Sequence, residues 1–242
     1  MLGLLATAVL LAAGVVWYVR QGPVVKIEVA ADSDELVVTP AFRDTMGNYA
    51  TTLPIGQVPA PPDRQDRCAG RHRWAHSPPI NGVDAGSSVA KVDITALSED
   101  LKIDRAVLDV RTPEGDPPTM VLLACPGRGG PKPPHLLVAD LDTGELLFFP
   151  DGDDEPDNFD LRITAGETES IFVIGSILET HARWRLELGG DSGETRIEYT
   201  IGPDGAREGR AAANPDQRPF ETIGEFLTTP YRFRDGAWQP GR

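Results

Sequence analysis

Positive charge is scarce in this sequence, and its scarcity argues against two classes of partner. The 242 residues include 23 lysines and arginines against 37 aspartates and glutamates, which gives a formal net charge of −14. Such a field repels the phosphate backbone of nucleic acids. It disfavours anionic lipid headgroups for the same reason. We therefore expect no nucleic-acid partner, whereas cationic ligands, metal ions and basic partners are compatible with the charge.

Helical patterning is also scarce beyond the first twenty residues. Only residues 220–227 have some helical spacing, and Gly224 weakens it. From residue 87 onward, short runs rich in Val, Ile, Leu, Phe and Tyr alternate instead with Gly, Pro, Asp and Asn. Residues 184–188 alternate apolar and charged side chains, as in an antiparallel sheet with one wet face. We predict an all-β fold, with an antiparallel β-sandwich-like domain over residues 87–242.

Charged side chains are absent from the first 19 residues, which are mainly Leu, Val and Ala. As a helix this run would span about 28 Å, close to the hydrocarbon thickness of a bilayer. We expect a transmembrane anchor over residues 1–22, with residues 1–20 contacting the membrane and the soluble domain outside the cell. Residues 23–86 would form juxtamembrane strands and a Pro-rich irregular region. A cleaved signal peptide is the alternative, but no suitable cleavage site follows the apolar run.

Cysteine occurs only twice, at Cys68 and Cys125. Outside the cytosol, two cysteines in a β-rich domain usually pair, so we predict one disulfide between them. Two independent buried thiols are the alternative.

A complete catalytic motif is missing. Residues 190–193, which include Ser192, resemble the nucleophile segment of chymotrypsin-like serine proteases, and His76 precedes them as the general base does in that family. The glycine and proline that the family places after the serine motif are replaced by Glu194 and Thr195, and its flanking cysteines are absent. A hairpin turn accounts for the glycines. An envelope serine hydrolase that uses Ser192 and His76 is kept as an alternative.

The candidate metal ligands also fail to form a known pattern. Asp151, Asp153 and Asp157 belong to an acidic loop that could bind Ca²⁺, but the spacing differs from the calcium-loop pattern. His72 and His76 would share a face only on a helix, and the prolines that follow argue against one. We predict no metal and no cofactor.

Several strings resemble those of uncharacterised actinobacterial membrane-anchored proteins. They are residues 71–76, 106–110, 124–130 and 184–188. The resemblance implies an outward-facing β domain of unknown function and carries over no functional residues. Taken together, the sequence favours a non-enzymatic binding module at the cell envelope, with another envelope protein as partner. An extracytoplasmic sensor domain is the second alternative.

Overall fold

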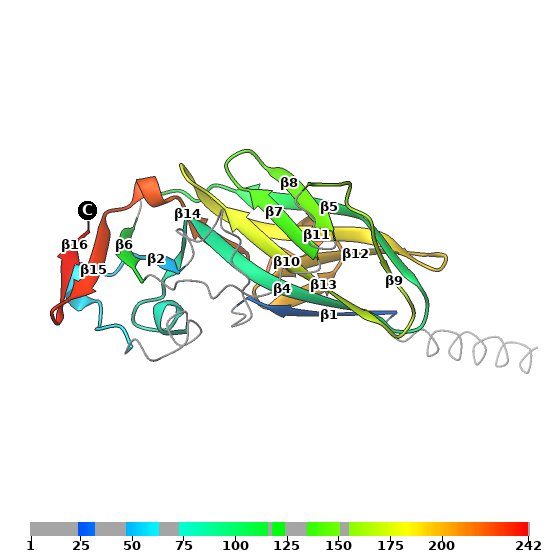
Figure 1. Cartoon of the computed structure of the whole chain (residues 1–242), viewed down its shortest axis with the longest axis horizontal. Coiled ribbons are helices and arrows are strands. Elements are labelled where there is room, and N and C mark those ends of the chain that lie inside the picture. Colours follow the sequence, from blue (N-terminus) through cyan, green and yellow to red (C-terminus); the bar gives the residue numbers. More distant parts are fainter. Residues whose placement is uncertain are drawn as a thin grey trace, which may run out of the picture.

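The computed structural model describes residues 24–31, 47–62, 73–115, 118–123, 135–150 and 155–241. Figure 1 shows an elongated molecule in which a larger body of long strands continues into a smaller lobe that contains β2, β6, β15 and β16. Strands dominate the described residues, and helical structure there is limited to one turn and short 3-10 segments. The all-β prediction is therefore confirmed.

The first sheet has five strands in the order β1-β4-β10-β7-β8. All neighbours are antiparallel except β10 and β7, which run parallel. The strands are β1 (Val25–Ala30), β4 (Ser87–Ala96), β7 (His135–Asp140), β8 (Glu145–Pro150) and β10 (Thr168–Ser176).

The second sheet has eleven strands and extends from the larger body into the smaller lobe. Its main path is β13-β12-β11-β14-β3-β2-β6-β15-β16, with β5 paired to β11 and β9 paired to β5. Two pairs in it, β14–β3 and β15–β6, are parallel, so the sheet is mixed rather than purely antiparallel. The strands are β2 (Asn48–Thr51), β3 (Val83–Ala85), β5 (Leu101–Arg111), β6 (Thr119–Leu122), β9 (Leu161–Ile163), β11 (His181–Ser192), β12 (Thr195–Gly202), β13 (Gly205–Glu208), β14 (Phe220–Ile223), β15 (Pro230–Arg234) and β16 (Ala237–Pro240).

The main core contains side chains from both sheets. Val92, Leu137 and Ile171 come from the first sheet, whereas Trp184 and Leu186 come from β11 of the second, and all belong to one buried cluster. Successive strand residues point to opposite faces, so the alternation in residues 184–188 places one set in this core. The predicted apolar face of that segment is thus confirmed, with Trp184 only 1% exposed.

The smaller lobe has its own apolar cluster. Tyr49, Val58 and Val121 are buried there, and the ring of Trp74 stacks on that of Trp238 with 6.3 Å between centroids. Residues 23–86, predicted as juxtamembrane strands and a Pro-rich irregular region, supply side chains to this cluster and strands β1, β2 and β3 to the two sheets.

Two predictions are corrected by the structure. Where the chain is described, no helix is long and apolar enough to cross a membrane. The described residues likewise contain no disulfide, and their two sheets pack around a shared core. Residues 1–20, Cys68 and Cys125, on which these predictions were based, lie outside the described residues.

Candidate partner-binding surface

A single carboxylate fixes the turn between β10 and β11. Asp142, in the β7–β8 turn, accepts hydrogen bonds from the backbone N–H groups of Leu178, Glu179 and Thr180 at 2.8, 3.3 and 3.1 Å. The hydroxyl of Thr180 donates to the same side chain at 2.7 Å. Three consecutive N–H groups are thereby satisfied at a position where no strand partner is available. The turn is held in one conformation by a residue 36 to 38 positions earlier in the chain.

The electrostatics of Asp142 agree with this role. Partial burial by itself raises the pKa of the carboxyl group, but the backbone N–H groups of residues 178–180 and the Thr180 hydroxyl oppose it, and the net shift is downward from 3.8. Hydrogen bonds donated to a carboxylate stabilise its charged form. Asp142 is therefore held as an anion whose acceptor capacity is used by the turn.

A glycine brings a second segment against the same turn. The backbone N–H of Gly224 donates to the carbonyl oxygen of Thr180 at 2.7 Å. A Cβ at position 224 would collide with the carbonyl oxygen of Leu178, so only glycine permits this approach. The 3-10 segment η4 (Glu225–Leu227), which follows directly, is thereby positioned beside the turn.

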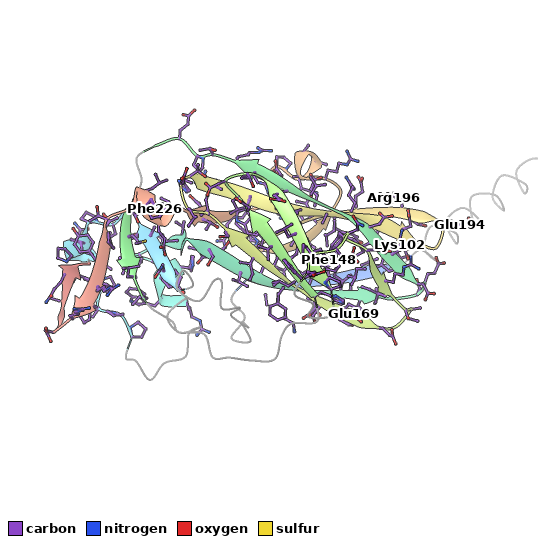
Figure 2. All side chains as sticks on the ribbon, turned by 45° about the horizontal axis from the view of Figure 1, so that its top comes forward. Lys102, Phe148, Glu169, Glu194, Arg196 and Phe226 are labelled. Carbon is purple, nitrogen blue, oxygen red and sulfur yellow. The ribbon has the colours of Figure 1, made fainter. Side chains whose placement is uncertain are left out.

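Two large apolar side chains are exposed on either side of this contact. Leu178 is 47% exposed and Phe226 is 77% exposed, the largest exposed fraction among the large apolar side chains of the described residues. Figure 2 shows Phe226 at the junction of the larger body and the smaller lobe. We call Leu178 and Phe226 the junction surface. Single exposed apolar side chains are common on protein surfaces, whereas neighbouring exposed apolar side chains can mark a binding site.

The backbone at Phe226 is held in place by its neighbours. Leu227 packs against the buried cluster around Ala50 and Ile223. The Glu225 side chain accepts a hydrogen bond from the amide of buried Asn48. With one neighbour packed inward and the other anchored to β2, η4 holds the backbone of Phe226 in place and leaves its side chain exposed.

The charge around the junction surface has one sign. The segments that carry Leu178 and Phe226, residues 176–180 and 224–228, and the adjoining turn at residues 140–145 contain five carboxylates and no lysine or arginine. Those carboxylates belong to Asp140, Asp142, Glu145, Glu179 and Glu225. Such a rim favours the approach of a partner that carries positive charge.

The predicted catalytic pair is not brought together. The His76 Nε2 atom lies 3.1 Å from Asp84 Oδ1, and the imidazole contacts the ring of Tyr49 edge-on. Tyr49 belongs to β2, at the end of the molecule that holds the smaller lobe (Figure 1). Ser192 is at the end of β11, two residues before Glu194, which Figure 2 shows at the opposite end.

Ser192 also lacks the surroundings of a nucleophile. Its side chain is fully buried, and its hydroxyl has no hydrogen-bond partner among the residues that the structure describes. In the strand register it lies opposite Leu101 on one side and Thr195 on the other. A nucleophilic serine needs a base within hydrogen-bond reach and access for substrate, and this hydroxyl has neither within the described fold.

The predicted metal ligands are only partly described. Asp151, Asp153 and His72 lie outside the described residues. Asp157 pairs with Phe148 through a single β-bridge, and its carboxylate accepts a hydrogen bond from the backbone N–H of Asn158 at 2.7 Å. Within the described ranges of the chain, no group of three histidine, cysteine or acidic side chains could hold a metal ion.

The junction surface could not be recognised from the sequence pattern. Residues 220–227 have weak helical spacing, but the structure forms strand β14 and η4 there, with Gly224 between them. A usable signal is a large aromatic residue, Phe226, between Gly224 and Pro230, since both of these residue types often interrupt helices and strands.

Comparison with known proteins adds no relative. Protein-family models, curated proteins and solved structures were each searched, and none of them matches this chain. The resemblance to actinobacterial membrane-anchored proteins therefore stays a prediction, and the function has to be argued from the geometry.

Proposed function

We propose that this protein is a β-sandwich-like, non-enzymatic binding module whose partner docks on the junction surface. The observation that carries the proposal is the exposure of Phe226 on a backbone that its two neighbours hold in place. Binding costs less when the contact residues are already held in the bound arrangement. Aromatic anchors at the centre of an interface also contribute a large share of binding energy.

The chemistry of the junction surface indicates the class of partner. An aromatic ring and a leucine side chain require an apolar complement, and the surrounding carboxylates require positive charge. A polypeptide that presents an aromatic or aliphatic side chain next to lysines or arginines satisfies both needs. The net charge of −14 acts in the same direction over longer range, by accelerating the encounter with a basic partner.

Peptide selection tests the proposal without requiring the partner to be identified first. A random peptide library displayed on phage is selected against the full chain, and the enriched peptides are synthesised and measured by fluorescence polarisation. We expect them to combine an apolar side chain with flanking basic residues. Replacement of Phe226 by serine should weaken their binding about 30-fold, as for an interface hot spot. Leu178→Ser should cause a smaller loss.

Val107 offers a matched control. It is 42% exposed on the outer face of β5, so Val107→Ser also removes an exposed apolar side chain, from a different surface. Peptide affinity should be unchanged in this variant, and the melting temperature of Phe226→Ser should equal that of the native protein, since the ring is mostly in water. The proposal fails if the selected peptides bind Phe226→Ser as tightly as the native chain.

A further inference from the structure

The C-terminal β15–β16 hairpin has two chemically different faces. Its strands are joined by Asp235 and Gly236, both at positive φ (52° and 78°), as two-residue hairpin turns require. On one face, Phe233 and Trp238 pack edge-to-face at 5.2 Å, and the Trp238 Nε1 atom donates to the carbonyl oxygen of Val58 at 3.0 Å. The aromatic face therefore attaches the hairpin to the smaller lobe and leaves the other face to solvent.

The solvent face carries two arginines without carboxylate partners. Arg232 and Arg234 alternate with the aromatic residues along β15, so both side chains leave the same face, about 7 Å apart along the strand. Neither forms an ion pair within the described residues, not even with Asp235 in the adjacent turn. Other arginines of this acidic protein are paired, among them Arg105 with Glu198 and Arg185 with Asp109. Arg232 and Arg234 thus place two uncompensated positive charges side by side on one face of β15.

These arginines line an open pocket of about 270 Å³. Its other lining residues are Gln239, Pro240 and Gly241. Gln239 lies opposite Arg232 in the hairpin register, and its side-chain amide makes only a long 3.5 Å contact with the carbonyl oxygen of Arg234. Two guanidinium groups and an amide thus face a space large enough for a small anion, and no carboxylate of the described residues lines it.

We propose that this pocket binds the phosphate group of a small phosphomonoester or of free phosphate. A guanidinium donates to oxyanions as a planar fork. One such fork satisfies a carboxylate, whereas a phosphomonoester presents three oxygens and nearly two negative charges at neutral pH. Its dianion can therefore accept from Arg232, Arg234 and Gln239 together. The acidic remainder of the chain disfavours long polyanions but leaves a small dianion able to reach this local cationic site. The site is independent of the junction surface.

Nuclear magnetic resonance titration of the labelled full chain tests the site. The ligands are inorganic phosphate, methyl phosphate, dimethyl phosphate and acetate, added at constant ionic strength and pH 7.5, with the arginine Nε–H and backbone signals of residues 230–241 followed. We expect saturable shifts with phosphate and methyl phosphate, and binding about tenfold weaker or more for the two monoanions. Binding of free phosphate alone, without methyl phosphate, would still support the site and would identify the free anion as the ligand.

Variants separate a built site from general charge attraction. Arg232→Gln and Arg234→Gln should each weaken phosphate binding about tenfold, and both side chains are exposed, so the fold should be retained. Arg207→Gln on β13 is the matched control, because Arg207 is also exposed and forms no ion pair within the described strands. Phosphate binding should also weaken from pH 7.5 to 5.5, since the second pKa of a phosphomonoester is about 6. Acetate binding as tightly as phosphate, an equal loss in Arg207→Gln, or shifts that never saturate would each overturn the proposal.

Discussion

The indole ring of Trp184 lies directly against the backbone of Gly175. A Cβ on Gly175 would approach the Trp184 Cζ2 and Cε2 atoms to 2.6 and 2.8 Å, which is closer than carbon atoms can pack. The ring also stacks on Phe220, with 4.5 Å between centroids, and its Nε1 atom donates to the Thr222 hydroxyl at 3.1 Å. Gly175 belongs to the first sheet and Trp184 to the second, so this contact sets how closely the two sheets approach.

Replacement of Gly175 by alanine should therefore destabilise the protein. The added methyl group must displace a ring that is fixed by stacking and by a hydrogen bond, and overpacking of this kind costs about 1–3 kcal/mol. Gly56→Ala is the control, because a Cβ at Gly56 would have no atom within 4 Å. Urea unfolding should show a lower free energy of unfolding for Gly175→Ala only. Equal stability of the two variants would contradict the packing argument.

Arg185 should contribute more to stability than its neighbour Arg183. The Arg185 side chain is only 7% exposed, pairs with Asp109 at 3.1 Å and donates to the carbonyl oxygen of Gln217 at 3.0 Å through Nε. Arg185→Ala leaves the Gln217 carbonyl oxygen without this donor and Asp109 with only the exposed Arg111, so the loss should be about 3 kcal/mol. Arg183 is on the same strand with its side chain 53% exposed, so Arg183→Ala should cost about 1 kcal/mol or less.

Thermal and urea unfolding of both variants check this prediction. The loop that includes Gln217 should also lose protection from hydrogen exchange in Arg185→Ala, because the guanidinium no longer holds its carbonyl groups. An equal loss of unfolding free energy in the two variants would show that the burial of Arg185 does not increase its contribution to stability.

Much of the local structure could be predicted from the sequence. The alternation in residues 184–188 correctly assigned Trp184 to the core, because side-chain direction in a strand depends only on position along it. The pair Asp235-Gly236 is a typical sequence signal of a two-residue hairpin turn, and both residues have the positive φ that such a turn requires. Each of these inferences depends on neighbouring residues alone.

The pairing of strands and the junction surface could not be predicted in this way. The alternation of apolar and polar residues along a strand indicates which face is buried, but it does not indicate which strand lies alongside. The parallel pairing of β7 with β10 therefore could not be predicted from either segment. In the sequence, Asp142 cannot be distinguished from any other aspartate in a turn. It accepts hydrogen bonds from residues 178–180 only because the fold brings the β7–β8 turn next to the β10–β11 turn. Exposure of Phe226 likewise depends on distant Asn48 and Ala50.

Acid should weaken the fold partly through Glu221. Its hydrogen bond with His181, 2.9 Å long, is the main cause that lowers the pKa of the carboxyl group from 4.5, with Arg183 adding to the effect against partial burial. A lowered folded-state pKa means that the stabilisation is present above pH 4.5 and is lost as the pH falls through the folded-state value.

The free energy of unfolding of Glu221→Gln should therefore depend less steeply on pH in the acid range than that of the native protein. Urea unfolding measured from pH 7 to pH 3 should show the native protein losing stability below pH 4.5 more steeply than the variant. Glu194→Gln, in the exposed β11–β12 turn, is the control and should leave the slope unchanged. An identical slope in Glu221→Gln and the native chain would show that the pKa of Glu221 does not differ between the folded and unfolded states.

Loss of the Asp142 carboxylate should loosen the junction surface before it unfolds the protein. Asp142→Ala leaves three backbone N–H groups of residues 178–180 without an acceptor, so their amide exchange should accelerate while exchange in β10 and β11 stays slow. The cost in stability should be about 1–2 kcal/mol, since Asp142 is well exposed and water can replace part of the interaction. Asp157→Asn is the control, because that carboxylate accepts a single local N–H.

Because the pKa of Asp142 is lowered, the same amides in the native chain should lose protection as the pH falls below 3.8. Unchanged amide exchange at Leu178 and Thr180 in Asp142→Ala would contradict this prediction. The turn would then be held by the hydrogen bond between Gly224 and Thr180 and not by the carboxylate.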